Sequence, residues 1–311
     1  MFSNLSNVQN TPVIGIKSPL WNYSNLQDAT LSMPKRDDVR TKKILVQPSP
    51  YADLIEHLVT PSEEELLNSC SLLALCPEWK RKSYAVEIAQ DEYSHYVCQT
   101  YYFEVLGFQI LSSIVIQSKD FSLIHQAAAQ AIDEARHIEL YAKLLDNLRC
   151  KSQPASCMPA LYKYAVDQGN VNEKIIRGMV VLESIAIGLF SARATAYATA
   201  PISKIDRQVL SEESNHQNDA VQILARVIRE GDIQIDDVVE IMRETVDKLT
   251  FDILPLNVAT RHNLPLSEEQ IGTLRHRGIL AKQTHVSRMN LIHLLKRVRR
   301  TIPGARASDT L

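Results

Sequence analysis

The sequence predicts an all-α protein: a bundle of long helices, with further helices after it and an irregular arm before it. Three observations support this prediction. Glycine is scarce, at 9 of 311 residues, and long stretches contain no helix-breaking residue. Apolar side chains recur three and four positions apart, which is the period of an α-helix with one buried face. Four such stretches follow one another along the chain, as in a helical bundle.

The N-terminal segment 1–60 differs in composition from the rest of the chain. It is rich in asparagine, serine and proline. We expect residues 1–60 to form an irregular arm that wraps on the main body, with Trp21 and Tyr23 as anchors. Residues 61–311 are expected to form one helical domain, with the bundle at about 79–230 and C-terminal helices at 235–300.

Local signals indicate where the expected helices begin and end. Residues 60–63 (TPSE) resemble a helix start, with an early proline and an acid in the first turn. Asp120 is placed to cap a helix after the turn at 117–120, and Asn170 with Glu173 resembles another helix start. Gly231 is placed to end a helix. The expected helices are 62–76, 79–116, 121–149, 170–198, 201–229, 235–253 and 266–300, with a break at 150–159.

Composition and charge exclude several classes of protein. The net charge of -2 argues against a general nucleic-acid binder. No uninterrupted apolar run approaches the roughly 18 residues expected of a membrane span. The chain also opens without the basic start and apolar run of a secretory signal. Five cysteines, an odd number with no Cys-x-x-Cys pair, predict reduced thiols. Together these features predict a cytoplasmic protein with no membrane or nucleic-acid partner.

Residues 131–140 (AIDEARHIEL) carry charges at the centre of an otherwise apolar helical pattern. Glu134 and His137 stand three positions apart and therefore share one face of the helix. They need a partner, because an unpaired buried charge is too costly to keep. A later helix repeats the pattern with Glu213 and His216. Two helices therefore offer Glu-x-x-His on a buried face.

The other two long helices each supply one glutamate. In the third helix, Glu183 is a single charge in an apolar stripe. In the first helix, Glu104 competes with a further Glu-x-x-His formed by Glu92 and His95. Antiparallel helices joined by a turn bring residues to one height when these are equally far from the turn. Glu104 matches the height of Glu134, whereas Glu92 would miss it by roughly 15 Å or more at about 1.5 Å per residue.

Equal spacing argues against coincidence. Glu104 and Glu134 are as far apart along the chain as Glu183 and Glu213, as expected of two helix hairpins related by a pseudo-twofold axis. A single Glu-x-x-His is more often a solvated helix face, and we keep that interpretation for the pair at positions 92 and 95. Glu183 by itself could be a satisfied core carboxylate. The predicted metal ligands are Glu104, Glu134, His137, Glu183, Glu213 and His216.

This ligand set is rich in oxygen, with a minority of nitrogen. It favours iron or manganese over zinc or copper. Four glutamates balance the charge of two divalent ions, which would lie about 3.5–4 Å apart, the usual separation in two-metal sites. We therefore expect two iron ions, or a manganese–iron pair, that bind and reduce dioxygen with electrons from an external donor.

The acids directly before the two glutamates have an expected role in an outer layer. A metal-bound histidine usually donates its other ring proton to a carboxylate. By the pseudo-symmetry, Asp133 should accept the outer ring proton of His216, and Glu212 should accept that of His137. Arg136 would neutralise part of this outer layer.

The pattern resembles the signature of ferritin-like di-iron carboxylate proteins. DEARH at 133–137 is similar to the DExRH form common among di-iron oxygenases. Within that superfamily the chain resembles the p-aminobenzoate N-oxygenase family, through QAIDEARH at 130–137, VVLESIAIG at 180–188 and SEESNH at 211–216. The resemblance covers roughly residues 95–230. It implies a ferritin-like four-helix bundle and an oxygenase that uses dioxygen to hydroxylate or N-oxygenate a small organic substrate.

One position departs from that family. Those N-oxygenases carry an extra histidine ligand one helical turn before the last glutamate, where this chain has Val209. Asp206 and Gln217 fall on the same stripe but are poor substitutes. The departure predicts poor oxidation of aryl amines. It favours attack on a C–H bond or another position of a small substrate, free or carrier-bound.

Three alternatives belong to other functional classes. A non-catalytic iron-handling protein would usually be shorter and lack the arm and C-terminal helices. A radical generator resembling the ribonucleotide reductase small subunit could use Tyr141, four residues after His137, although a core tyrosine is the simpler interpretation. A desaturase or hydroxylase could dock an acidic carrier protein on a basic C-terminal patch, although a solvated helix is the simpler interpretation there. The patch consists of Arg275, Arg277, Lys296, Arg297, Arg299 and Arg300.

The expected partners are a small-molecule substrate and an electron donor, with a carrier protein and a homodimer as further options. Helical phase also places four candidate pocket residues near the metal level. These are Tyr101, Gly107, Ile187 and Gln217.

Overall fold

The computed structural model describes residues 61–148, 158–198, 201–248, 254–277, 291–298 and 300. The chain divides into two units, Met1–Glu56 and His57–Leu311, and the described residues all belong to the second. The predicted arm at 1–60 lies outside the described residues. Every regular element in the described residues is a helix, which confirms the all-α prediction for this part of the chain.

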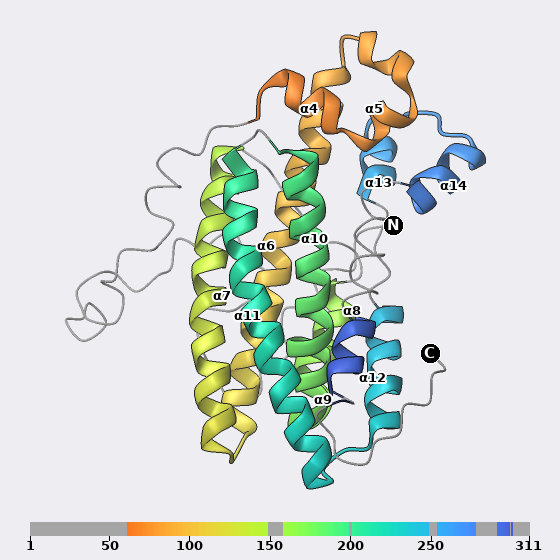
Figure 1. Cartoon of the computed structure of the whole chain (residues 1–311). Helices are drawn as coiled ribbons and strands as arrows, with labels where there is room; N and C mark the ends of the chain where they lie inside the picture. The colour runs from red at the N-terminus through yellow and green to blue at the C-terminus, as the bar shows by residue number, and fades with distance from the viewer. Residues whose placement is uncertain are drawn as a thin grey trace, which may run out of the picture. The chain divides into compact units, whose positions relative to one another are not determined.

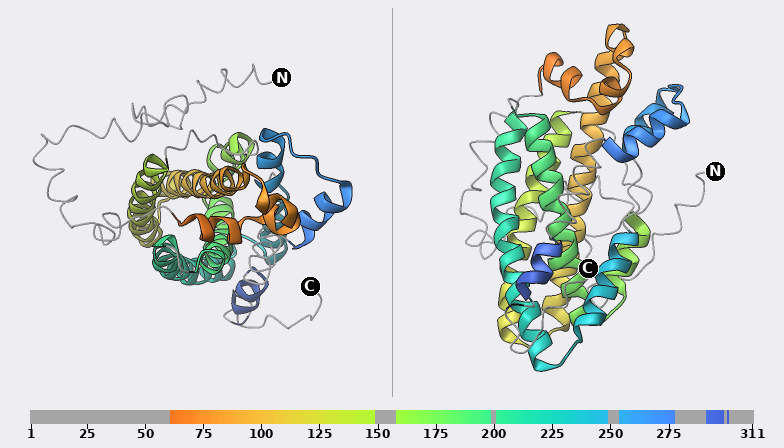
Figure 2. Two further views of the ribbon diagram at one scale, coloured as in Figure 1. Left: turned by 90° about the horizontal axis from the view of Figure 1, so that it is seen from above. Right: turned by 45° about the vertical axis from the view of Figure 1, so that its right-hand side comes forward.

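Four long helices lie side by side in a bundle (Figures 1 and 2). Helix α6 pairs with α7, and α10 pairs with α11, so that each pair is a hairpin of helices consecutive along the chain. Contacts between α7 and α11, and between α6 and the segment before α10, close the bundle. The bounds are Ala85–Gln117 for α6, Phe121–Asn147 for α7, Glu183–Ala196 for α10 and Pro201–Glu230 for α11.

Three of the predicted helix ends agree with the observed structure. The Asp120 side chain accepts a hydrogen bond of 2.8 Å from the backbone N–H of Ser122 and begins α7. Asn170 accepts one of 3.1 Å from the N–H of Glu173 and begins α9 (Val171–Lys174). Gly231 has φ +81°, a left-handed conformation that glycine adopts without strain, and it follows the last residue of α11. The helix predicted to begin at 79 instead begins at Ala85 as α6, after a separate 3-10 helix at Pro77–Arg81.

The third long helix is interrupted by a π-helical stretch, η5 (Ile175–Leu182), between α9 and α10. A π-helix is wider than an α-helix and often marks a functional position; here it ends directly before Glu183. Gly178 lies inside it, and a Cβ there would come within 2.6 Å of Ile110 Cγ2. Only glycine therefore lets α6 approach η5 this closely. The sequence pattern did not predict the π-helix, because apolar periodicity cannot separate it from an α-helix of similar length.

The stretch 171–196 is also long and apolar enough to cross a membrane by length and composition. No other helix in the described residues meets that test, and 83% of its most apolar window is buried inside the protein. Such burial is consistent with a core helix of a soluble protein. Arg177 and Glu183 interrupt the apolar sequence of this stretch, so it contains no uninterrupted apolar run of membrane-spanning length.

The prediction of one helix over 62–76 is wrong. Two short helices, α4 (Glu63–Ser69) and α5 (Ser71–Leu75), are separated at Cys70, whose ψ of 121° is extended. The Glu92 carboxylate of α6 accepts hydrogen bonds from the backbone N–H groups of Ser71 (2.7 Å) and Leu72 (3.3 Å). The Glu92 carboxylate therefore caps the first backbone N–H groups of α5, whose own N-cap residue, Cys70, makes no side-chain hydrogen bond to them.

The remaining described helices lie at one end of the bundle and along one of its sides (Figures 1 and 2). Helix α12 contacts η5, α13 contacts α6, and α14 contacts α5. The predicted helix 266–300 includes 278–290, which lie outside the described residues. Helices α8, η4 and α13 were not predicted, and α8 begins within the predicted break at 150–159. The bounds are Pro77–Arg81 for the 3-10 helix η3, Met158–Tyr162 for α8, Lys163–Asp167 for the π-helix η4, Ile235–Lys248 for α12, Leu254–Arg261 for α13 and Glu268–Arg277 for α14, with a further helical stretch at 291–298.

Candidate metal centre

The six residues predicted as metal ligands lie together in the middle of the bundle. Their oxygen and nitrogen atoms form two groups, and within each group the atoms lie within 4.8 Å of one another. One group consists of Glu104, Glu134, His137 and Glu213, and the other of Glu134, Glu183, Glu213 and His216. The convergence predicted from spacing is therefore confirmed as geometry, while the binding of metal remains a prediction.

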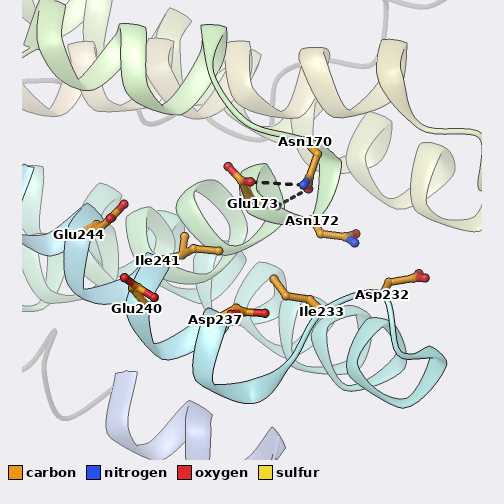
Figure 3. Close-up of a pocket in the computed structure, with 9 residues that line it drawn as sticks. All are labelled: Asn170, Asn172, Glu173, Asp232, Ile233, Asp237, Glu240, Ile241 and Glu244. Atoms are coloured by element: carbon orange, nitrogen blue, oxygen red, sulfur yellow. Dashed lines mark hydrogen bonds between the residues drawn. The ribbon is translucent and has the colours of Figure 1, made fainter.

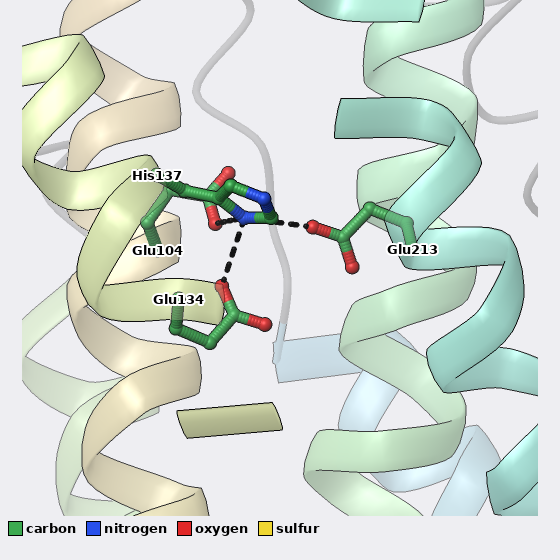
Figure 4. Close-up of side chains that lie close together, drawn as sticks. All are labelled: Glu104, Glu134, His137 and Glu213. Carbon is green, nitrogen blue, oxygen red and sulfur yellow. Dashed lines mark hydrogen bonds and ion pairs between the residues drawn. The ribbon is translucent and has the colours of Figure 1, made fainter. Parts of the chain in front are cut away.

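The first group is arranged around one ring nitrogen of His137 (Figure 4). His137 Nδ1 lies 3.3 Å from Glu104 Oε2, 3.5 Å from Glu134 Oε2 and 3.2 Å from Glu213 Oε1. These side chains come from α6, α7 and α11. A single cation placed among them would have one nitrogen and three carboxylate oxygens within reach.

The second group repeats the arrangement around His216. His216 Nδ1 lies 3.2 Å from Glu213 Oε2, 3.5 Å from Glu134 Oε1 and 3.8 Å from Glu183 Oε1. Glu134 and Glu213 therefore point one oxygen at each histidine, whereas Glu104 and Glu183 each belong to one group. This is the pseudo-twofold relation that the equal spacing of the glutamates predicted.

The outer ring nitrogens of the two histidines have the predicted partners. His137 Nε2 lies 2.9 Å from Glu212 Oε2, and His216 Nε2 lies 3.2 Å from Asp133 Oδ2. Arg136 forms an ion pair with Asp133, as expected. A carboxylate at Nε2 holds the proton there and leaves the Nδ1 lone pair directed inward, toward a metal.

Burial sets the electrostatics of the six groups, whose exposure ranges from 0% to 6%. Burial, followed by the charge of neighbouring Glu134, raises the pKa of Glu104 well above its ordinary value. Burial and the Glu213 charge do the same to the pKa of Glu183. Although burial opposes it, the hydrogen bonds that the His216 ring donates to Glu183 and Glu213 raise the pKa of His216 to about 11. Without metal the cluster thus keeps protons, which an entering cation has to displace.

The residues present fit a pair of cations. Glu213 Oε1 is buried and, although it lies 3.2 Å from His137 Nδ1, makes no hydrogen bond; such a group calls for an explanation, for example a bound ion. Among the described residues no lysine or arginine forms an ion pair with the four glutamates, whose cationic partners are the two histidines. Two divalent ions would supply the missing positive charge.

Removing an outer carboxylate is expected to weaken metal binding without unfolding the protein. Asp133→Asn and Glu212→Gln keep the shape of each side chain but lose the charge that holds the histidine proton. We expect each to lower metal affinity roughly 10–100-fold, the usual cost of losing such a partner. Competition with a chromogenic chelator measures the change. Glu139→Gln, which alters only the exposed pair with Lys143 on the same helix, is the control, and unchanged affinity in both outer variants would contradict the assignment.

The solvated-face interpretation of Glu92 and His95 is wrong. Glu92 is 0% exposed and His95 is 8% exposed. Glu92 caps α5 and also accepts a hydrogen bond of 3.3 Å from the Cys70 thiol, and burial raises its pKa. Neither residue belongs to the two ligand groups. The height argument therefore chose the glutamate that lies in a ligand group, and the rejected pair is buried rather than solvated.

A second buried polar layer crosses the bundle beside the ligand groups. Arg193 donates from Nε to Asp206 Oδ2 at 2.7 Å and from Nη2 to Asp206 Oδ1 at 2.5 Å. It also donates to Thr100 Oγ1 at 2.6 Å and to the Tyr141 hydroxyl at 3.1 Å. Tyr141 in turn donates to Asp206 Oδ1 at 3.3 Å. Each of the four long helices contributes one of these residues.

Sequence reasoning missed this layer. It considered Asp206 only as a substitute ligand, and the structure assigns that residue to Arg193 instead. The sequence did contain a pattern that could have predicted it. Arg193 and Asp206 lie at similar distances before and after the connection between α10 and α11, which places them at the same height in the hairpin. The bonded hydroxyl of Tyr141 agrees with the core-tyrosine interpretation.

Val209, which stands where the N-oxygenases have a histidine, is fully buried and belongs to neither ligand group.

The four candidate pocket residues have different surroundings. Gln217 donates a hydrogen bond of 2.9 Å to Ser184 Oγ and belongs to neither ligand group. Tyr101 and Ile187 are buried. Gly107 faces the Glu134 carboxylate, and a Cβ there would lie 3.6 Å from Glu134 Cδ. Of the four candidates, Gly107 is the one with a described contact to a predicted ligand.

A separate pocket of about 330 Å³ lies between the start of α9 and α12 (Figure 3). It shares no residue with the ligand groups. Three of its polar residues have structural roles: Asn170 and Glu173 cap α9, and Glu244 accepts a hydrogen bond of 3.1 Å from Tyr164. The lining residues are Asn170, Asn172, Glu173, Asp232, Ile233, Asp237, Glu240, Ile241 and Glu244.

Comparison of the chain with models of protein families, with curated proteins and with solved structures found no match. The functional interpretation of the centre therefore rests on its residues and their geometry.

Proposed function

We propose that this protein is a ferritin-like, non-haem di-iron oxygenase that oxidises a small organic substrate. One observation carries the proposal: the two ligand groups share Glu134 and Glu213, and each adds one further glutamate and one histidine. Shared carboxylates hold two cations next to each other, which is the arrangement of two-metal sites. The ligand types favour iron, or a manganese–iron pair, because oxygen donors predominate and no thiol belongs to either group.

The chain's own residues would hold and enclose the ions. Glu104 and Glu183 would each bind one ion, and the two shared glutamates would bind both. Glu212 and Asp133 fix the orientation of the histidine rings. The low exposure of all six ligands keeps bulk water away, which strengthens every electrostatic interaction in the centre. A reduced iron pair held in this way would supply the electrons that activate dioxygen, with an external donor restoring them.

The alternatives differ from this proposal in what happens to the metal or to Tyr141. An iron-handling protein would release or store oxidised iron, and a radical generator would oxidise Tyr141. The Tyr141 hydroxyl is hydrogen-bonded on both sides, to Arg193 and to Asp206, which supports a structural role for it. A desaturase or hydroxylase with a carrier-bound substrate would use the same centre, so it is a variant of the proposal.

The test is to load the purified protein with ferrous iron without air, remove unbound iron and then add oxygen. We expect tightly bound iron and rapid oxygen consumption, with the iron retained through repeated cycles of reduction. Iron released into solution after each cycle would favour the iron-handling alternative, and a persistent tyrosyl signal in electron paramagnetic resonance would favour the radical alternative. Failure to bind iron or manganese would overturn the proposal.

An arylamine panel with mass spectrometry tests the reaction class. We expect little hydroxylamine or nitro product, because Val209 cannot donate to iron in the place where the N-oxygenases have a histidine. Efficient nitro formation would restore the N-oxygenase assignment.

A further inference from the structure

Gly107 is an unusual residue for its place in α6. It is the single glycine in this helix of 33 residues, and glycine inside a helix is less favourable than alanine. It needs no left-handed backbone, since the positive-φ glycines of the described residues are Gly169 and Gly231. Some other property of the position must therefore explain a residue without a side chain.

Close helix packing does not explain it. At Gly178 a Cβ would come within 2.6 Å of the Ile110 side chain, which is too close. At Gly107 the nearest atoms to an added Cβ are Glu134 Cδ at 3.6 Å and Glu134 Oε2 and Oε1 at 3.7 and 3.8 Å. These are ordinary contact distances. The position has room for a Cβ, and a larger side chain there would lie against a carboxylate shared by both ligand groups.

The two residues of this contact differ in their exposure to solvent. Gly107 is partly exposed, whereas the Glu134 side chain that it faces is almost fully buried, at 2% of the residue's surface. A partly exposed residue of α6 that has no side chain therefore lies next to a buried, predicted metal ligand.

We propose that Gly107 forms the opening through which small molecules reach the metal centre, and that the absent side chain limits their size. This inference rests on the proposed function and adds to it the place of access. A larger residue at 107 would fill the space beside the Glu134 carboxylate. Alanine should narrow the opening and leucine should close it, while all six ligands remain in place.

The experiment compares wild type, Gly107→Ala and Gly107→Leu after loading with iron, using azide as a small anionic probe of the metal. Stopped-flow absorbance gives the rate of azide binding, and elemental analysis gives the iron content. We expect unchanged iron content and slower azide binding in Gly107→Leu, by on the order of tenfold or more, the scale on which added methylenes discriminate between ligands. Gly107→Ala should fall between leucine and wild type.

Gly272→Leu is the matched control. This helical glycine lies in α14, where a Cβ would meet nothing within 4 Å, and it should bind azide at the wild-type rate. Full iron content with wild-type azide rates in Gly107→Leu would overturn the access role and leave the proposed function intact. If Gly107→Leu does not fold, Gly107→Ala decides, because alanine fits at 3.6 Å; a wild-type rate in that variant overturns the inference.

A second measurement needs no metal and so separates the two proposals. Gly107→Cys should react with a small thiol reagent much faster than the buried Cys98 of the same helix, and a bulky reagent should react more slowly than the small one. Labelling of Gly107→Cys no faster than the background of the buried thiols would overturn the inference even if wild type binds no iron.

Discussion

Glu104→Ala is expected to empty one of the two metal positions and leave the other filled. Glu104 contributes to the group around His137 and has no part in the group around His216. Loss of a direct ligand should weaken binding at the first position by more than the roughly 10–100-fold typical of an outer partner. Elemental analysis after gel filtration would then show about half of the wild-type metal content.

Reciprocal and unrelated variants make this result specific. Glu183→Ala should empty the position around His216 instead, and Glu92→Gln should keep the full metal content because Glu92 caps α5. Metal should also raise the melting temperature, since an ion at about 1,000 times its dissociation constant stabilises the folded state by about 4 kcal/mol. Full metal content in Glu104→Ala, or an unchanged melting temperature of the metal-free wild type, would contradict the assignment.

Asp206→Ala is expected to be among the most destabilising single substitutions in the bundle. It would leave the Arg193 guanidinium, 2% exposed, without its carboxylate partner, and the Tyr141 hydroxyl without its acceptor. Burial lowers the pKa of Arg193, and in the wild type the Asp206 charge more than offsets this and raises it. An arginine side chain keeps its proton in proteins even without such a partner, so the variant would bury an unpaired charge. Breaking a buried pair costs about 3–5 kcal/mol. Urea unfolding of the metal-free protein measures this cost separately from metal binding.

A double variant distinguishes a charge effect from a loss of packing. Asp206→Leu combined with Arg193→Met removes both charges and should recover much of the stability lost by either change alone, because apolar replacements of a buried pair are often neutral. Removing the exposed ion pair of Lys143 and Glu139 should change stability by about 1 kcal/mol or less. A loss of that small size in Asp206→Ala would show that the buried layer contributes little.

The pattern of the chain was sufficient to place the predicted ligands. Helical period and distance from a turn are local properties, so the heights of Glu104 and Glu134, and of Glu183 and Glu213, can be compared by counting along the chain. The histidines three residues later share a face with their glutamates for the same reason. The preceding acids, Asp133 and Glu212, followed from the pseudo-symmetry of the two hairpins.

By itself, then, the sequence determined the all-α class, the succession of four long helices and the six side chains that meet in the described bundle. Three contacts were decided only by the tertiary structure. Glu92 caps the helix that begins after the break at Cys70, Arg193 pairs with Asp206, and Gly107 faces Glu134. These contacts depend on the rotation of each helix and on how closely it approaches its neighbours. Both are set by the volumes of side chains distant in sequence, such as Ile110 against Gly178, which no local period records.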